Sequence, residues 1–119
     1  MKLISLDLIN FRNYESLHLE LDPGVNLIVG NNAQGKTNLL ESVVYLSQSA
    51  SYRTRKEEEL IRWNQDFARL EAKIQGQDRE TELVYALFRG SRRRQIMKNG
   101  VRQKSAAGTE GILTTVLFC

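Results

Sequence analysis

The chain has 119 residues, of which 41% are hydrophobic and 26% charged, and its formal net charge is +3. This length suits one small domain, and the composition excludes a disordered or fibrous protein. Its single cysteine, Cys119, excludes a disulfide framework within the chain and fits a reducing compartment. We find no signal peptide and no stretch near the roughly 20 apolar residues of a membrane span, so we expect a cytoplasmic protein without a membrane partner.

The first thirty residues have the pattern of strands. Leu17, Leu19 and Leu21 alternate with polar residues, which is the period of a half-buried strand. Residues 2–9 form an earlier candidate strand, and residues 10–14 would turn between the two. A turn signal follows at residues 22–24, and the apolar run at 25–29 predicts a short buried strand.

The period changes after residue 35. Leu39, Leu40, Val43, Val44 and Leu46 recur at helical spacing, which predicts a helix over residues 36–47. Residues 47–54 read as a loop and 56–63 as a short helix.

The second half of the chain returns to strand patterns. Residues 68–75 and 81–88 predict two strands joined by a turn at 76–78. Asn99-Gly100 predicts a type I′ hairpin turn between strands at 94–98 and 101–103, because both residues tolerate a positive φ. A small-residue loop at 104–111 precedes another expected strand at 112–118. The chain stops just after this apolar run, which suggests a cut through a larger domain.

One motif carries specific chemistry. The run Gly30-Asn31-Asn32-Ala33-Gln34-Gly35-Lys36-Thr37 fits the phosphate-binding pattern G-x-x-x-x-G-K-[ST]. Glycines allow the loop to wrap a phosphate with its N–H groups pointing inward, and the dipole of the following helix favours an anion. Lys36 would reach the β- and γ-phosphates, and the Thr37 hydroxyl would ligate Mg²⁺. The alternative is a glycine loop that merely joins strand to helix.

The residues for hydrolysis are not recognisable. A hydrolytic enzyme of this type needs an acid at the end of an apolar strand to help hold Mg²⁺. No run of four apolar residues followed by Asp or Glu occurs after the motif. Glu41, on the predicted helix, is interpreted as a surface or helix-packing carboxylate. We therefore expect no catalytic residue within these residues.

The chain resembles the N-terminal part of the RecF family of bacterial recombination mediators, which are ABC ATPases of the structural-maintenance-of-chromosomes type. The resemblance covers essentially all 119 residues. It is carried by Leu8-Ile9-Asn10-Phe11-Arg12-Asn13-Tyr14, by residues 30–41 with Asn32 and Asn38, by Tyr52-Arg53-Thr54 with Glu59-Leu60-Ile61-Arg62-Trp63, and by Val116-Leu117-Phe118.

The resemblance implies a function that spacing alone does not show. RecF-like proteins bind ATP with Mg²⁺ and double-stranded DNA, dimerise around ATP, and act with the RecO and RecR proteins to load the RecA recombinase at gaps. Arg12, Asn13 and Asn38 match family positions at the nucleotide. A solvated turn arginine is the alternative for Arg12. The family's signature motif and Walker B acid would lie beyond residue 119, which leaves hydrolysis and ATP-driven dimerisation by these residues in doubt.

A basic run surrounds the predicted Asn99-Gly100 hairpin. Its cations are Arg89, Arg92, Arg93, Arg94, Lys98, Arg102 and Lys104, with no acid among them. They could follow a DNA backbone, and Arg53 with Arg55 is a second, weaker candidate for DNA contact. A solvated edge strand is the alternative. No aromatic residue interleaves these cations, so stacking on single-stranded bases is not suggested.

Four further side chains are assigned structural roles. His18 has no partner at metal-ligand spacing and is interpreted as a surface residue. Trp63, Phe67 and Tyr45 are expected to pack in the core.

Together these features predict an α/β fold of the P-loop NTPase type, part of an ABC-type head, with a mostly antiparallel, twisted sheet around one P-loop helix. Residues 1–119 would form an ATP-binding subdomain. Two rival hypotheses remain: a complete small P-loop kinase or GTPase, and a nucleotide-independent DNA-binding module on a P-loop scaffold.

Overall fold

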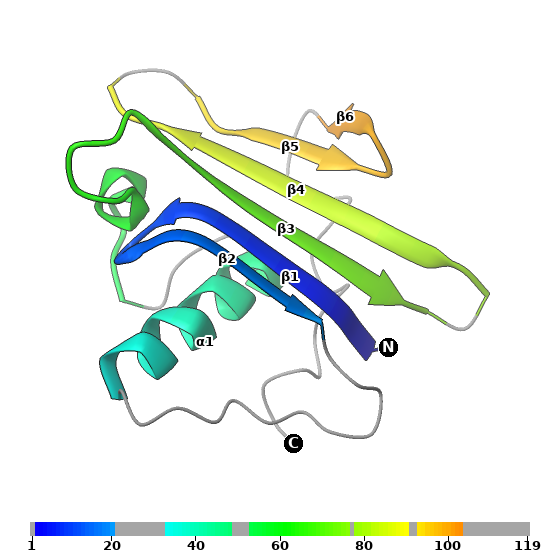
Figure 1. Cartoon of the computed structure of the whole chain (residues 1–119). Coiled ribbons are helices and arrows are strands. Elements are labelled where there is room, and N and C mark those ends of the chain that lie inside the picture. Colours follow the sequence, from blue (N-terminus) through cyan, green and yellow to red (C-terminus); the bar gives the residue numbers. More distant parts are fainter. Residues whose placement is uncertain (1, 21–32, 49–52, 77, 91–92, 104–119) are drawn as a thin grey trace.

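The structure of the chain is a computed structural model that describes residues 2–20, 33–48, 53–76, 78–90 and 93–103 (Figure 1). The strands predicted at residues 25–29 and 112–118 lie outside these ranges, as does the turn at 22–24. Along the chain the described elements are β1 (Lys2–Phe11), β2 (Tyr14–Glu20), α1 (Ala33–Gln48), the 3₁₀ helix η1 (Glu57–Leu60), β3 (Phe67–Gln75), β4 (Glu80–Phe88), β5 (Gln95–Lys98) and β6 (Val101–Gln103).

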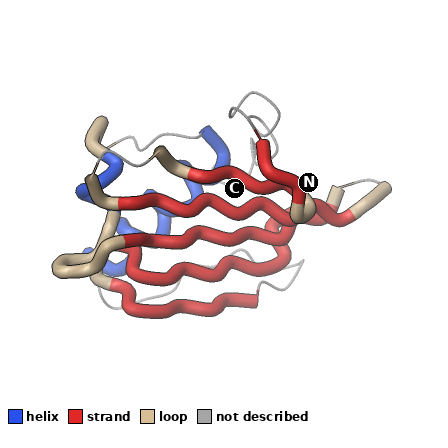
Figure 2. Tube along the Cα trace, turned by 90° about the horizontal axis from the view of Figure 1, so that it is seen from above, coloured by secondary structure: helices blue, strands red, loops and turns tan. Residues whose placement is uncertain are grey.

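The strands form a single sheet with the order β2-β1-β3-β4-β5-β6. Every pairing between these strands is antiparallel. Figure 2 shows the strands as one layer with the helices on one side of it. The predicted antiparallel sheet around one long helix is confirmed for the part of the chain that the structure describes.

The core lies between the sheet and α1. On β3, Ala68, Leu70, Ala72 and Ile74 are all buried, while the residues between them are half-buried or exposed. This alternation places every second side chain against the helix, as the period of a strand requires. The helix adds Leu39, Val43 and Leu46 to the same cluster of buried side chains. Burial of each large apolar side chain contributes roughly 1.5–3 kcal/mol, so the two-layer packing holds the sheet and α1 together.

Two tight turns illustrate how local chemistry shapes the sheet. β1 continues to Phe11, beyond the predicted end at residue 9, because Phe11 is fully buried and pairs with Tyr14 and Ile61. The turn to β2 is therefore reduced to two residues. The predicted type I′ turn is confirmed in its backbone, since Asn99 has a φ of 52° and Gly100 a φ of 80°.

Both helix predictions need correction at their ends. α1 begins at Ala33, three residues before the predicted start, and ends at Gln48. The short helix predicted over residues 56–63 is a single 3₁₀ turn, Glu57–Leu60. Its first three residues are glutamates, and only Leu60 of the four is buried, so little packing supports a longer helix.

Two of the three aromatic residues assigned to the core are not in it. Tyr45 is completely buried, as predicted, but Trp63 is 83% exposed and Phe67 is 40% exposed. Trp63 lies in the loop between η1 and β3, outside both layers. Phe67 occupies a position of β3 whose side chain points to the face opposite the helix, because its neighbour Ala68 points inward.

The two faces of β1 provide a test of this packing. We expect Leu8→Ala, at a fully buried position, to lower the free energy of unfolding by about 2–5 kcal/mol through lost burial and a residual cavity. Ile9→Ala, next in sequence but 38% exposed, should cost less than about 1 kcal/mol. Urea unfolding followed by circular dichroism measures both. Equal losses would contradict the assignment of the helix-facing side.

Candidate phosphate-binding site

The beginning of α1 carries the second part of the glycine-rich motif. Residues 33–37 form the first residues of the helix, whereas the predicted contacts Gly30, Asn31 and Asn32 lie outside the described residues. The first turn of α1 contains no acidic residue. Unpaired N–H groups at a helix start and the helix dipole favour an anion there, and no carboxylate in the first turn competes for them. The contacts predicted for Ala33, Gln34, Gly35, Lys36 and Thr37 stay predictions.

Glu41, one turn further along α1, is the centre of a buried ion cluster. Its side chain is completely buried. Arg12 donates from Nε to Oε1 at 2.8 Å and from Nη2 to Oε2 at 2.9 Å, a bidentate pair. Arg53 donates to the same Oε1 at 3.2 Å. Of the two alternatives predicted for Glu41, the surface carboxylate is wrong and the helix-packing carboxylate is confirmed, because its side chain packs inward from α1 and joins two arginines.

Two asparagines extend this cluster toward the start of the helix. Asn38 is buried and donates from Nδ2 to Oδ1 of Asn13 at 2.7 Å. Its own Oδ1 accepts a hydrogen bond from Arg53 Nη1 at 2.7 Å. The structure thus brings together three residues predicted to lie near the nucleotide, namely Arg12, Asn13 and Asn38. It adds Arg53, which sequence reasoning assigned to DNA.

The cluster carries more positive than negative charge. Two guanidinium groups share one buried carboxylate. The hydrogen bond from Arg12 to Glu41 raises the pKa of Arg12 against the opposing effect of burial, and the charges of Glu41 and Glu59 add smaller contributions. The side chains of Arg12 and Arg53 stay 21% and 33% exposed. Because the excess charge is partly accessible and lies beside the first turns of α1, the cluster is complementary to an anion.

A sequence signal for Glu41 existed. Apart from Lys36, it is the only charged residue of α1, which is otherwise apolar or neutral. Asn38, Glu41 and Tyr45 also follow at intervals of three and four, so they share one face of the helix. What the sequence could not show is which cations approach that face, since Arg12 and Arg53 come from separate segments.

Tyr45 centres a second network on the same face of α1. Its hydroxyl donates to Glu57 Oε2 and accepts from Arg94 Nη1 at 2.9 Å, and Arg94 also reaches Glu57 at 2.9 Å. The Arg94 guanidinium lies 5.9 Å from the Tyr45 ring centre and 5.8 Å from that of Tyr85. Burial, reinforced by Glu57, raises the pKa of Tyr45. Arg94, predicted to contact DNA, is therefore engaged inside the fold.

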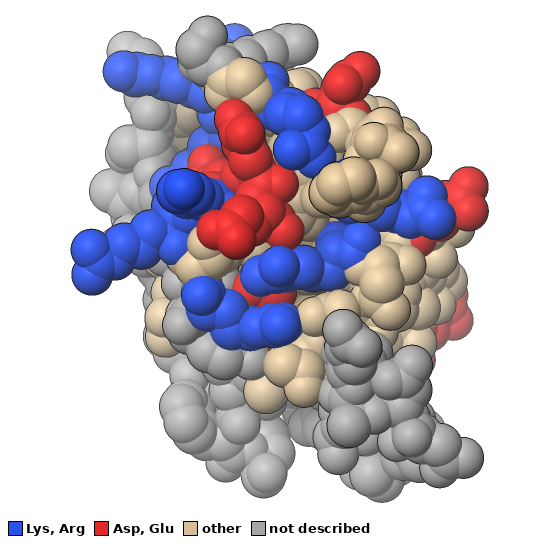
Figure 3. Space-filling view, turned by 90° about the vertical axis from the view of Figure 1, so that its left-hand side faces the viewer, with Lys and Arg blue, Asp and Glu red and all other residues tan. Residues whose placement is uncertain are grey.

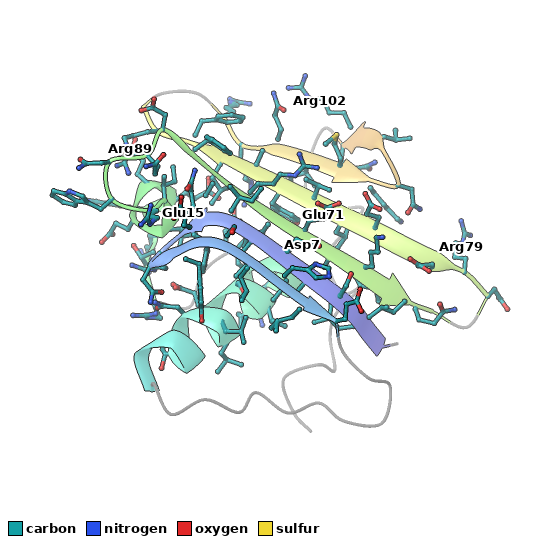
Figure 4. All side chains as sticks on the ribbon, in the orientation of Figure 1. Asp7, Glu15, Glu71, Arg79, Arg89 and Arg102 are labelled. Carbon is teal, nitrogen blue, oxygen red and sulfur yellow. The ribbon has the colours of Figure 1, made fainter. Side chains whose placement is uncertain are left out.

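The other predicted DNA contacts do not form one surface. Arg93 is exposed, and Arg92 lies outside the described residues. Lys98 pairs with Val101, whereas Arg102 pairs with Met97, so the two cations belong to opposite faces of the β5–β6 hairpin. Figure 4 places Arg89 and Arg102 in separate regions of the molecule. Alternation along the strands separates charges that are adjacent in sequence.

His18 is a surface residue, as predicted. It interacts with Asp7 and Glu20, and the hydrogen bond to Asp7, with a smaller contribution from Glu20, raises the pKa of His18. Asp7 and Glu71 lie opposite each other on β1 and β3 (Figure 4).

Among the described residues, no group of histidines, cysteines and carboxylates has a geometry that could hold a metal ion. In the same residues, no helix is both long and apolar enough to cross a membrane.

Comparison with known proteins shows the family to which the chain belongs. A family described as AAA domain matches residues 5–116, nearly the whole chain. The chain belongs to the AAA domain family. The expected resemblance to RecF is also confirmed. The DNA replication and repair protein RecF of Staphylococcus haemolyticus is 41% identical over 99% of this chain and 31% of its own length.

Solved structures support the same AAA-family fold. A structure described as the recombination mediator protein RecF-ATPrS in the RecFOR pathway has a TM-score of 0.84 at 32% identity, covering 92% of this chain and 30% of that one. A second, described as RecF-ATP, has a TM-score of 0.82 at 33% identity with the same coverages. This AAA-family chain spans about a third of the length of the curated relatives it matches.

The buried ion cluster of this AAA-family chain generates a stability prediction. Glu41→Gln should lower the free energy of unfolding by about 1–3 kcal/mol, because the partly exposed Arg12 and Arg53 lose the carboxylate that accepts their hydrogen bonds. Glu15→Gln, which neutralises an exposed glutamate on β2, is the matched control and should change stability by less than about 0.5 kcal/mol. Urea unfolding at neutral pH compares the two. A similar, small effect for both variants would show that the cluster is not needed to stabilise the fold.

Proposed function

We propose that the chain binds ATP with Mg²⁺ and forms the nucleotide-binding part of a RecF-type DNA repair ATPase. The observation that carries this proposal is the cluster of Arg12, Arg53, Asn38 and Glu41 beside the first turns of α1. The two guanidinium groups of the cluster are complementary to a phosphate. Its two residues on α1, Asn38 and Glu41, follow the glycine-rich motif in sequence. The relatives solved as RecF-ATP and RecF-ATPrS support the nucleotide class.

Each group has a chemical role in this proposal. The N–H groups of residues 30–35 would hold the phosphates, Lys36 would bind the β- and γ-phosphate oxygens, and the Thr37 hydroxyl would ligate the metal. Mg²⁺, when bound, neutralises phosphate charge through hard oxygen ligands. We propose Arg12, Asn13 and Asn38 as further contacts to the nucleotide; Asn38 is hydrogen-bonded to Asn13 and to Arg53. Binding, rather than hydrolysis, is what we propose for these residues, because the sequence shows no strand-terminal acid after the motif.

The wider function belongs to the longer protein. We propose that a RecF-type protein containing this chain binds double-stranded DNA, forms an ATP-dependent homodimer, and acts with RecO and RecR to load a recombinase at gaps. Within this chain, we propose the exposed Arg93 as a contact to a DNA phosphate, with Arg92 and Lys98 as further proposed contacts. The competing hypothesis, a nucleotide-independent DNA-binding module, predicts DNA binding without any ATP affinity.

A calorimetric titration of ATP with Mg²⁺ into the chain tests nucleotide binding. We expect binding by the wild-type chain and a loss of affinity of at least about tenfold in Lys36→Ala, because a charge-assisted contact to the phosphates is removed. Lys73→Ala, on the exposed side of β3, is the control and should bind normally. Absence of ATP affinity in the wild-type chain would favour the nucleotide-independent alternative.

A salt titration separates the two arginines of the β4–β5 segment. Arg93→Ala should reduce the slope of log affinity against log salt concentration by about one, which corresponds to one lost phosphate contact. Fluorescence anisotropy of a labelled duplex measures the affinity at each salt concentration. Arg94→Ala should instead lower the thermal midpoint, because Arg94 bridges Tyr45 and Glu57. An unchanged salt slope in Arg93→Ala would remove this residue from the DNA surface.

A further inference from the structure

The largest aromatic side chain of the protein is displayed on its surface. Trp63, the single tryptophan, is 83% exposed, whereas Tyr45 and Tyr85 are completely buried. The neighbours of Trp63 in its loop, Arg62 and residues 64–66, are all polar, so the indole is not the edge of a buried cluster. An aromatic ring held outside the core has its faces available to a ligand.

The loop that carries Trp63 is fixed by backbone hydrogen bonds on both sides. The Arg62 N–H donates to the Asn10 carbonyl at 2.7 Å, and the Gln65 N–H donates to the Arg62 carbonyl at 3.0 Å. Asn64 adopts a φ of 65°, which closes the turn. A ring presented on a fixed loop loses little conformational freedom when it binds, so the exposed indole is preorganised.

Arg89 joins this loop to the basic segment. Its Nε donates to the Gln65 carbonyl at 2.8 Å, its Nη2 reaches the Arg62 carbonyl at 3.4 Å, and its backbone N–H donates to the Asp66 carbonyl at 2.9 Å. The basic run lacks an aromatic residue in sequence, but the fold places Trp63 beside its first cation. Carbonyl groups do not neutralise Arg89, so its charge stays available to an anion.

At the end of the molecule that carries this loop, cations surround a group of carboxylates (Figure 3). Figure 3, which views the molecule from this end, shows lysine and arginine side chains around a central group of acidic ones. The glutamates of η1 already accept hydrogen bonds within the fold: Glu57 from Arg94, Glu58 from the Gly90 N–H, and Glu59 from Thr54. An anionic chain would therefore be attracted to the surrounding cations and kept from the central carboxylates.

We propose that Trp63 is a base-stacking residue: an unpaired nucleotide base stacks on its indole while Arg62 and Arg89 bind the flanking phosphates. Stacking requires an exposed aromatic face and a basic surface that follows the backbone, and both meet at this loop. Bases paired within a duplex do not offer a free face. This inference rests on the proposed DNA-binding function and specifies unpaired bases as the part of the nucleic acid that this loop recognises.

A protein partner is the competing explanation of an exposed tryptophan. In protein interfaces, the residues that contribute most of the binding energy are surrounded by neighbouring contacts that exclude water. Here the loop neighbours of Trp63 are arginine, asparagine, glutamine and aspartate, and Arg89 is hydrogen-bonded to the same loop. This surrounding favours an anionic ligand with flat rings over an apolar protein surface.

The single tryptophan makes the test direct. An oligothymidylate of roughly 15 nucleotides, within the usual range for single-strand binding surfaces, is titrated into the chain at low salt while the Trp63 emission is recorded. A blunt duplex of the same length is the second ligand, and anisotropy of the labelled strands measures affinity independently. We expect quenching by the single strand and a loss of single-strand affinity of roughly 5- to 150-fold in Trp63→Ala, with Trp63→Phe close to wild type.

The controls and outcomes distinguish this inference from the function it rests on. Val101→Ala, which changes an exposed apolar residue on β6, should bind as the wild type does. Binding of either nucleic acid with unchanged emission and unchanged affinity in Trp63→Ala would overturn stacking, leave DNA binding intact, and point to a protein partner for the indole. Quenching by the duplex alone would overturn the preference for unpaired bases. No binding of either ligand would overturn this inference together with the DNA contacts proposed for Arg93 and Lys98 of this chain.

Discussion

The carboxylate of Glu41 is the point on which the site depends. A fully buried charge is tolerated only when it is paired and hydrogen-bonded, and here Arg12 and Arg53 provide that compensation. These three residues come from α1, from the turn between β1 and β2, and from the segment before η1. The requirement to compensate one buried charge therefore fixes three separate segments relative to the start of α1, where the phosphate is proposed to bind.

A second constraint lies one turn further along the same helix. Tyr45 is buried against Tyr85 in an edge-to-face contact with ring centres 5.3 Å apart, and its hydroxyl lies between Glu57 and Arg94. α1 thus holds η1 and the segment leading into β5 through polar contacts, in addition to its apolar packing on the sheet. η1 in turn leads directly into the loop that displays Trp63. The proposed phosphate site and the proposed base-stacking loop are supported by one helix and the segment bound to it.

Local patterns were sufficient for much of the fold. Alternation predicted β3 and β4 to within one residue, and Asn99-Gly100 predicted a turn whose two residues do have positive φ. These features depend on neighbours in sequence, so periodicity and turn chemistry reveal them. The predictions were wrong where contacts between residues far apart in sequence determine the structure. Phe11 extends β1 because it pairs with Ile61. Trp63 lies outside the core because no part of the described sheet or helix covers it.

The sequence by itself determined that a phosphate-binding loop precedes an amphipathic helix, because the eight residues of the motif are contiguous and their chemistry is local. It also indicated the resemblance to RecF. Only the tertiary structure decided which charges act together. It moved Arg53 to the cluster at α1, turned Arg94 inward, separated Lys98 from Arg102 by strand alternation, and placed Trp63 beside Arg89. Which charged and aromatic side chains interact depends on the distances between them in the folded chain. A sequence pattern does not contain those distances.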